Sequence, residues 1–339
     1  MMLARVCRST LAPQVQSFYK APVNIPQLSK IQTVRLFAND GRTSFTRSAR
    51  ARQSLVTEKL AQPAGETAFK IGQGAVAGGA ALGIGALCFY GLGLSGQAGA
   101  IDKAGMWPQY VKDRIHTTYM YFGASVVTSA LSAAACLRSP AMMNLVMRQG
   151  WLAIIGTMAA MMGSGILAQS IPYQEGFGAK QLAWLAHTSI IGAVLAPACL
   201  LGGSLVMRAA WYTAGVVGGL SAVAVCAPSD KFLNMGGPLA IGLGVVFCSS
   251  IGTMFLPPTT AMGAGLHSIA LYGGLILFSM FLLYDTQRII KRAETTPNYG
   301  YSNVAPFDPI NNAISIYLDT INIFIRILTI LAGGGNRRK

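Results

Sequence analysis

The sequence predicts an all-α polytopic membrane protein. The 339-residue chain is 53% hydrophobic and only 11% charged, whereas about a quarter of the residues of a soluble domain are charged. Eight apolar runs are each long enough, at about 20 residues, to cross the bilayer core as a helix. The links between them are too short to fold alone, so the runs predict one bundle. The eight runs are 74–94, 115–136, 151–171, 181–202, 208–227, 236–256, 264–288 and 309–332.

The N-terminal region is strongly basic. Residues 1–60 contain ten Lys or Arg and only two acids. A basic, hydroxyl-rich and acid-poor segment is typical of a mitochondrial transit peptide. The stretch "RLFA" at 35–38 resembles a processing site, which predicts that residues 1–37 are removed. The alternative is a basic tail that binds anionic lipid or nucleic acid.

The predicted organisation follows from these runs. Glycines at small-xxx-small spacing, Gly74/Gly78 in the first run and Gly215/Gly219 in the fifth, let helix backbones approach closely in lipid. They indicate contacts with other membrane proteins or with a second copy of the chain. The predicted parts are a transit peptide (1–37), a basic matrix-facing segment (38–72), an extra N-terminal transmembrane helix (73–95), a membrane domain (110–333) and a basic tail (334–339).

Eight spans place both mature termini on the same side of the membrane. The segment before the first span and the final "NRRK" are both basic. Because basic segments favour the cytoplasmic side, or its mitochondrial equivalent, both termini are expected in the matrix.

A row of polar residues runs along the last span. Their spacing of 3, 4, 3, 4 and 3 residues puts them on one face of a helix whose other residues are apolar. Such a face must lie inside the bundle or against a watery cavity, because a charge at the bilayer centre costs about 2.5–3.5 kcal/mol on insertion scales. The polar seam comprises Asn312, Ser315, Asp319, Asn322, Arg326 and Thr329.

Asp285, in "FLLYDTQ", is the only acid of the preceding span and is the expected partner of Asp319. Two carboxyl groups close together in a low-dielectric site share a proton, because both cannot ionise cheaply. Deprotonated, they present the hard oxygen ligands that Ca²⁺ prefers. The two aspartates therefore predict a site where protons and Ca²⁺ compete.

Two alternatives involve no such site. Asp285 could simply end its span as a solvated or ion-paired carboxylate, since Arg288 and Arg292 follow it. Asp319 could pair statically with Arg326, although seven residues separate them by about 10.5 Å along a helix.

The two aspartate motifs resemble those of the transmembrane Bax-inhibitor-motif family. "FLLYDTQRIIKRAE" and "SIYLDTINIFIRIL" carry the likeness, and "GTMFLPPTT" is similar to the family's mitochondrial member. The resemblance implies a seven-helix Bax-inhibitor-like bundle with a central last helix, here preceded by one additional N-terminal transmembrane helix. It also implies a pH-sensitive di-aspartyl site for Ca²⁺, formed by Asp285 and Asp319.

The chain departs from that family at one point. In relatives an arginine of the second bundle helix latches the aspartate pair, but the matching run 151–171 contains no arginine. Arg148, just before that run, and Arg326 are the candidates to replace it.

The predicted function is proton-coupled Ca²⁺ transport in the mitochondrial inner membrane, by exchange or by a pH-gated leak. The resemblance adds roles in cristae organisation and in restraint of apoptosis. The alternative is a non-transporting protein that organises cristae and retains apoptotic factors. No Ser-His-Asp set, H-x-x-E-H motif or Walker loop occurs, so neither an enzyme nor a cofactor is expected. The expected partners are the lipid bilayer, Ca²⁺ and membrane proteins, and not nucleic acid.

Overall fold

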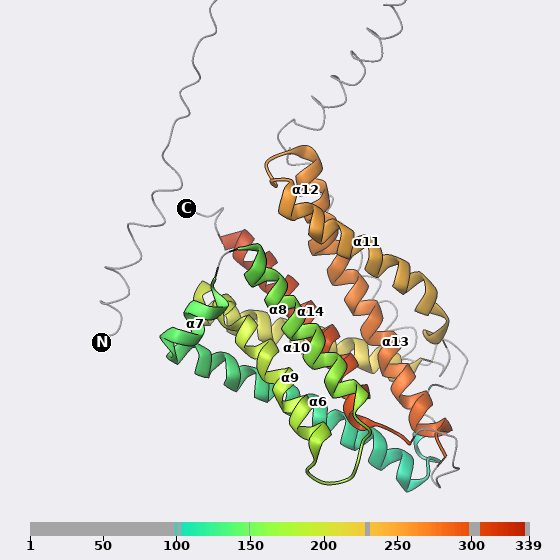
Figure 1. Ribbon diagram of the computed structural model, residues 1–339. Helices are drawn as coiled ribbons and strands as arrows, with labels where there is room; N and C mark the ends of the chain where they lie inside the picture. Colours follow the sequence, from blue (N-terminus) through green and yellow to red (C-terminus); the bar gives the residue numbers. More distant parts are fainter. Residues whose placement is uncertain (1–98, 100–102, 149, 228–230, 298–305, 336–339) are drawn as a thin grey trace, which may run out of the picture. The chain divides into compact units, whose positions relative to one another are not determined.

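The fold is known from a computed structural model that describes residues 99, 103–148, 150–227, 231–297 and 306–335. Every regular element in these ranges is helical (Figure 1). Seven helices are long and apolar enough to cross a membrane, which confirms seven of the eight predicted runs. The predicted transit peptide, basic segment and extra helix (1–37, 38–72 and 73–95) lie outside the described residues, as does most of the tail 334–339.

The helices follow one another with short links. They are α6 (Gln109–Arg138), α7 (Pro140–Val146), α8 (Trp151–Ser170), α9 (Ala179–Leu195) with the 3₁₀ turn η1 (Ala196–Leu201), α10 (Gly203–Cys226), the 3₁₀ turn η2 (Leu233–Met235), α11 (Gly236–Phe255), α12 (Ala261–Ser268), the π-helical turn η3 (Ile269–Gly273), α13 (Gly274–Thr295) and α14 (Pro309–Gly335).

Two of the links contain sequence signals for helix starts. Ser139 is the N-cap of α7 and accepts a hydrogen bond from the Met142 amide, and Pro140 occupies the first turn, where it needs no amide proton. Thr260 caps α12 by accepting from the Gly263 amide at 3.1 Å. The link after the second run, which the sequence places between two spans, thus contains a short helix, α7.

The seventh predicted run, 264–288, is longer in the structure. The helix continues from Ala261 to Thr295 through η3. Charged residues end the apolar run in the sequence, but they do not interrupt the backbone hydrogen bonds of the helix. Asp285 therefore lies ten residues before the helix end, about 15 Å along the axis. It does not end its span.

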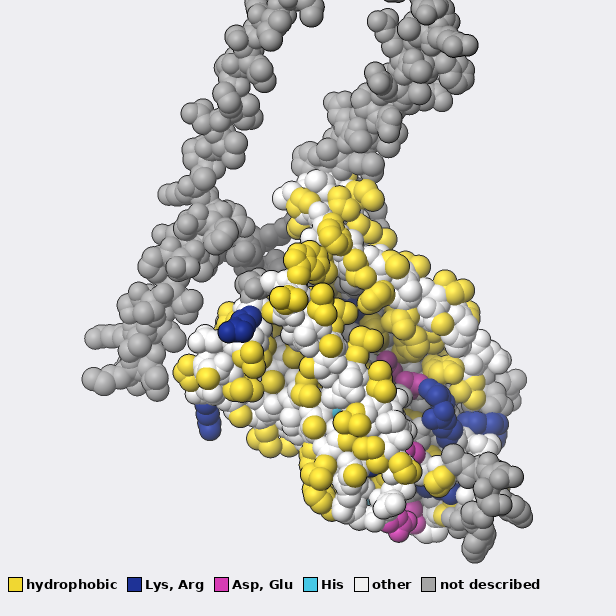
Figure 2. All heavy atoms as spheres, in the orientation of Figure 1, with side chains coloured by type: hydrophobic (Ala, Val, Ile, Leu, Met, Phe, Trp, Pro, Cys, Tyr) yellow, Lys and Arg dark blue, Asp and Glu magenta, His cyan; other side chains and the backbone are white. Residues whose placement is uncertain are grey.

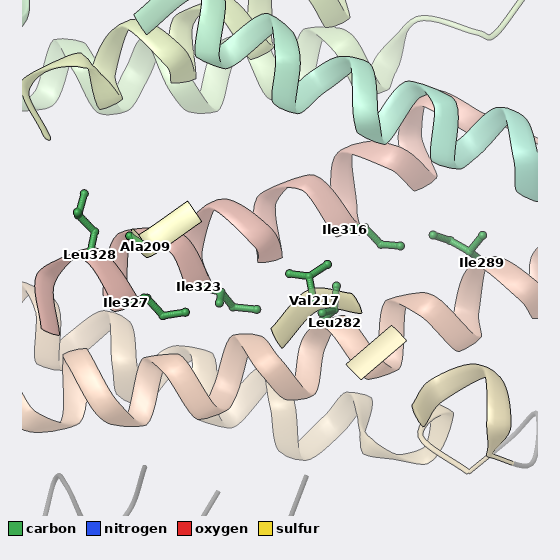
Figure 3. Close-up of a cluster of buried hydrophobic side chains, with 8 residues drawn as sticks. All are labelled: Ala209, Val217, Leu282, Ile289, Ile316, Ile323, Ile327 and Leu328. Atoms are coloured by element: carbon green, nitrogen blue, oxygen red, sulfur yellow. The ribbon is translucent and has the colours of Figure 1, made fainter. Parts of the chain in front are cut away.

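The helix α14 lies at the centre of the bundle. It packs against α6, α10 and α13. In the most apolar 18-residue stretch of α14, 44% is buried inside the bundle, whereas only 11% of the corresponding stretch of α8 is buried. Figure 3 shows the apolar contact of three of these helices: Ile316 and Ile323 of α14 lie near Ile289 and Leu282 of α13, with Val217 of α10 beside them. The central last helix that the sequence predicted is confirmed.

Two helices lie at the periphery. α11 packs mainly on α12 and α13, and α8 mainly on α9. At their ends the rings of Trp151 and Phe255 stack with centroids 5.9 Å apart. Figure 2 shows apolar side chains spread over the visible face of the bundle, as expected of a surface that meets lipid.

Candidate ion-binding site

Three layers of facing residues form the interface between α13 and α14. Phe278, Asp285 and Arg292 are spaced by seven residues on α13 and face Arg326, Asp319 and Asn312 of the antiparallel helix α14, which have the same spacing. A seven-residue repeat keeps side chains on one face of each of two packed helices. The repeat therefore places the two aspartates opposite one another in the middle layer.

The aspartate pair is buried. Asp285 is 7% exposed and Asp319 is 6% exposed. Their carboxyl groups interact and lie within hydrogen-bonding reach of each other. A carboxylate has no donor, so such a bond forms only when the pair holds a proton. The Oδ2 atom of Asp319 is buried and has no hydrogen-bond partner among the described residues.

Asp285 also contacts an arginine of its own helix. The Nη1 atom of Arg288 lies 3.5 Å from Asp285 Oδ1, and the Arg288 side chain is 38% exposed. The alternative that Asp285 is ion-paired is therefore correct for this contact. The accompanying idea of a solvated helix end is wrong, because Asp285 is buried well inside the helix.

The three residues Asp285, Thr286 and Gln287 are all buried, because α13 is surrounded at this level. Successive helix residues point about 100° apart, so they reach three different neighbours. Asp285 faces α14, and Gln287 donates to the Ala224 carbonyl of α10 at 3.2 Å. The hydroxyl of Thr286 donates to the Leu282 carbonyl of its own helix at 2.7 Å and lies next to Tyr119 of α6. These contacts fix the rotation of α13 and thereby the direction in which Asp285 points.

The layers on either side of the aspartates contain arginines. Towards the α13–α14 loop, Arg292 Nη1 donates to Asn312 Oδ1 at 3.0 Å. Towards the C-terminal end of α14, Arg326 lies over the Phe278 ring of α13, with its guanidinium carbon 4.5 Å from the ring centroid. The acidic layer is thus bounded by a cationic layer on each side.

The remaining predicted site residues are placed less centrally. Ser315 donates only to the Asn311 carbonyl of its own helix, and Thr329 is exposed. Asn322 accepts from Arg326. Arg148 is exposed between α7 and α8, and no ion pair joins it or Arg326 to either aspartate in the part of the chain that the structure describes. Arg288 is the arginine that contacts the pair.

Sequence reasoning missed Arg288, Phe278 and the π-helical turn as parts of this site. Arg288 was considered only as a charge that follows the end of a span. The seven-residue repeat on α13 is the signal that could have identified Phe278 and Arg292, because it matches the repeat on α14.

The arrangement suits a cation that binds and leaves. Two carboxylates provide up to four oxygen atoms, whereas Ca²⁺ takes six to eight. No cluster of three or more His, Cys, Asp or Glu occurs among the described residues, so water or backbone oxygens would complete the shell. Figure 2 shows acidic side chains in a recess between α8 and α13, next to basic side chains.

Comparisons with known proteins agree with this architecture. A family model described as "Inhibitor of apoptosis-promoting Bax1" matches residues 111–337. The chain is 60% identical to "Growth hormone-inducible transmembrane protein" of Rattus norvegicus, with 83% of this chain and 82% of the relative covered. It is 28% identical to "Bax inhibitor 1" of Oryza sativa subsp. japonica, over 52% of this chain and 66% of the relative. An uncharacterised protein of Helicobacter pylori is 30% identical over 64% of this chain and 85% of its own length. The chain belongs to the Bax inhibitor family of membrane proteins.

Proposed function

We propose that this protein exchanges Ca²⁺ for protons across the mitochondrial inner membrane. The observation that supports the proposal is the buried pair Asp285 and Asp319 in the middle of the α13–α14 interface. A buried acid pair is costly in a membrane interior, and ionisable residues kept there are usually functional.

The exchange would depend on the charge of the pair. When the pair releases its proton, two carboxylates attract a divalent cation and provide hard oxygen ligands. When the pair is protonated, the attraction falls and the cation leaves. Each state excludes the other ligand, which is the minimum requirement for coupling two opposite fluxes.

The proposed location rests on the basic N-terminal segment and on the resemblance. The inner membrane supplies a proton gradient and a potential that exchange could use. With both mature termini in the matrix, the α13–α14 loop would face the intermembrane space. We propose no enzymatic activity and no cofactor, and Ca²⁺ and H⁺ are the cargo.

The test is a flux assay with the purified chain in liposomes that contain a Ca²⁺ indicator. Asp319→Asn should lower Ca²⁺ flux by at least about tenfold and remove its response to an imposed pH gradient, because Asn cannot hold a proton that exchanges at neutral pH. Flux that rises only when a pH gradient is imposed would indicate exchange, and flux without a gradient would indicate a leak.

A matched control is Asp113→Asn. Asp113 is a carboxylate at the exposed start of α6, where it accepts from Gln109, and its loss should leave flux unchanged. If Asp319→Asn carried Ca²⁺ at the wild-type rate and with the wild-type pH response, the proposed site would be wrong.

A second function is a structural or interaction role, with cristae organisation and restraint of apoptosis as its outcome. Among the described residues, Gly215 and Gly219 of α10 have no neighbouring atom within 4 Å of an added Cβ, so this small-residue face is open in that part of the chain. It could receive a helix of a second copy or of another membrane protein. Deletion of residues 74–94 that abolished complexes while flux survived would separate this role from transport.

A further inference from the structure

Arg326 lies in a slot on α13 that is built to hold a guanidinium group. Its Nη1 donates to the Asn322 carbonyl oxygen at 2.9 Å and to Asn322 Oδ1 at 3.0 Å, and its Nε donates to the Ala270 carbonyl oxygen at 3.3 Å. The Phe278 ring covers one face of the group. All these partners are neutral, and Arg326 forms no ion pair within the described ranges.

The slot depends on two unusual features of the helix opposite. Ala270 lies in the π-helical turn Ile269–Gly273, and such a turn redirects backbone carbonyls and often marks a functional position. At Gly274 an added Cβ would lie 2.2 Å from Arg326 Nε, so a larger residue would expel the guanidinium. The local structure of α13 therefore accommodates a cation at this level.

The positive charge of Arg326 lies close enough to the aspartate pair to affect a cation that binds there. Arg326 follows Asp319 by seven residues, about 10.5 Å along α14. A divalent cation that left the pair towards the C-terminal end of α14 would meet a fixed positive charge. At an effective dielectric constant of about 20, the repulsion already corresponds to roughly a two-hundredfold change in occupancy at the separation of about 10.5 Å, and it grows as the cation approaches Arg326.

The opposite side of the pair is different. Arg288 is also cationic, but its side chain is 38% exposed and contacts Asp285 directly at 3.5 Å. An exposed, flexible side chain can swing away without breaking a built slot. Arg292, one turn further, donates to Asn312, but it is exposed, whereas Arg326 is half-buried. Access from the α13–α14 loop thus requires only a side-chain movement.

We propose that Arg326 is a charge barrier that closes the Asp285–Asp319 site towards the C-terminal end of α14, and that the π-helical turn and Gly274 hold the barrier in place. This inference rests on the proposed function. Cation release on that side requires Arg326 to leave its slot. A single fixed charge would thereby prevent the site from being open to both sides at once.

The experiment measures Ca²⁺ flux in liposomes without an imposed pH gradient. Arg326→Gln keeps a polar side chain but removes the charge, and it should raise this uncoupled flux by about tenfold, less than the full Coulomb estimate because water screens the charge. Arg326→Lys keeps a charge on a similar stem and should stay within about twofold of the wild type. Arg208→Gln, which removes the charge of an exposed arginine of α10 outside the polar seam, is the matched control and should change nothing.

A fourth variant addresses the slot itself. Gly274→Ala keeps the arginine but leaves no room for its guanidinium in the slot, so uncoupled flux should rise by about threefold, since the charge is displaced and not removed. If Arg326→Gln does not fold, as judged by thermal unfolding in detergent, Arg326→Lys and Gly274→Ala decide the matter.

The outcomes separate the two proposals. If Asp319→Asn loses flux while Arg326→Gln matches the wild type, the barrier is refuted and the transport site stands. If Arg326→Gln does not fold and Gly274→Ala has the uncoupled flux of the wild type, the barrier is likewise refuted and the transport site stands. If neither the wild type nor the Arg326 variants carry Ca²⁺ above empty liposomes, either with or without an imposed pH gradient, both proposals fail.

Discussion

Two buried polar interfaces in this bundle are built on opposite principles. Between α6 and α9, hydroxyl groups are neutral and well partnered: Ser129 Oγ contacts the carbonyl oxygens of Ser125 and Thr188 and the hydroxyl of Tyr317. Between α13 and α14, the central groups are two like-charged acids, and Asp319 Oδ2 has no hydrogen-bond partner among the described residues. Both interfaces are close-packed, but only one is electrostatically satisfied.

The difference indicates which interface stabilises the structure and which one would carry the proposed transport. Satisfied neutral hydrogen bonds in a membrane interior stabilise helix contacts modestly and do not change with ligand. An acid pair without full compensation costs stability and is retained where its charge is used. The α6–α9 interface is therefore expected to lose stability on substitution, and the α13–α14 layer to lose transport.

The largest expected effect concerns a buried charge that is fully compensated. Lys180 of α9 is 1% exposed in its side chain, pairs with Asp308 and donates to the Ile171 carbonyl oxygen at 2.7 Å. Removing one member of a buried ion pair leaves the other uncompensated, so Lys180→Met should lower the free energy of unfolding by about 3–5 kcal/mol. Denaturant unfolding in detergent would measure this.

The matched control is Lys112→Met on the exposed side of α6, which should change stability by less than about 0.5 kcal/mol. Because Asp308 is 20% exposed in its side chain, solvent can relieve part of the cost. A loss equal to that of the control would mean that opposite charges at this end of the bundle contribute nothing, and the contrast with the aspartate pair would lose its basis.

A smaller effect is expected where α6 and α9 touch. A Cβ at Gly192 would lie 2.3 Å from the backbone oxygen of Ser129, so the helices must separate to admit even alanine. Gly192→Ala should therefore lower the free energy of unfolding by about 3 kcal/mol through overpacking. Thermal unfolding of the purified chain would report the loss.

Gly218 provides the comparison for Gly192. It lies in α10, and no atom of the described residues comes within 4 Å of an added Cβ. Gly218→Ala should be neutral or stabilising by up to about 1 kcal/mol, because alanine is the better helix former. Equal stability changes at the two glycines would show that the close approach of α6 and α9 is not needed.

The sequence predicted the spans and the aspartate pair because both depend on local regularities. Apolar length sets a transmembrane helix, and a spacing of three and four residues sets the polar face of α14. The same regularity predicted that Asp319 lies inside the bundle. The pairing with Asp285 needed only the additional assumption that consecutive helices pack side by side.

The other features of the structure depend on contacts between distant residues, which cannot be predicted from the length and hydropathy of an apolar run. Lys180 and Asp308 are 128 residues apart, and Ser129 is one of several hydroxyl residues of α6, whose spacing does not show which of them contacts another helix. The π-helical turn at Ile269–Gly273 leaves the hydropathy unchanged. Arg288 was misread because its charge suggested a helix end, whereas the helix continues to Thr295.

The smallest expected effect has the opposite sign and tests the comparison most directly. Asp319→Asn keeps the shape of the side chain, removes one carboxyl from the buried pair, and gives Asp285 a hydrogen-bond donor in place of a second acid. The free energy of unfolding at neutral pH should rise by about 1 kcal/mol, because the wild-type pair must either keep two charges or take up a proton, whereas the Asn amide donates a hydrogen bond to Asp285 without either cost. Asp113→Asn, at an exposed carboxylate, should leave stability unchanged.

A stabilised variant that no longer carries Ca²⁺ would mean that the protein keeps the second acid at a cost in stability, as active sites commonly do. A variant destabilised by more than about 1 kcal/mol would instead place Asp319 among the residues that hold the bundle together, and the α13–α14 interface would then follow the same principle as the α6–α9 interface.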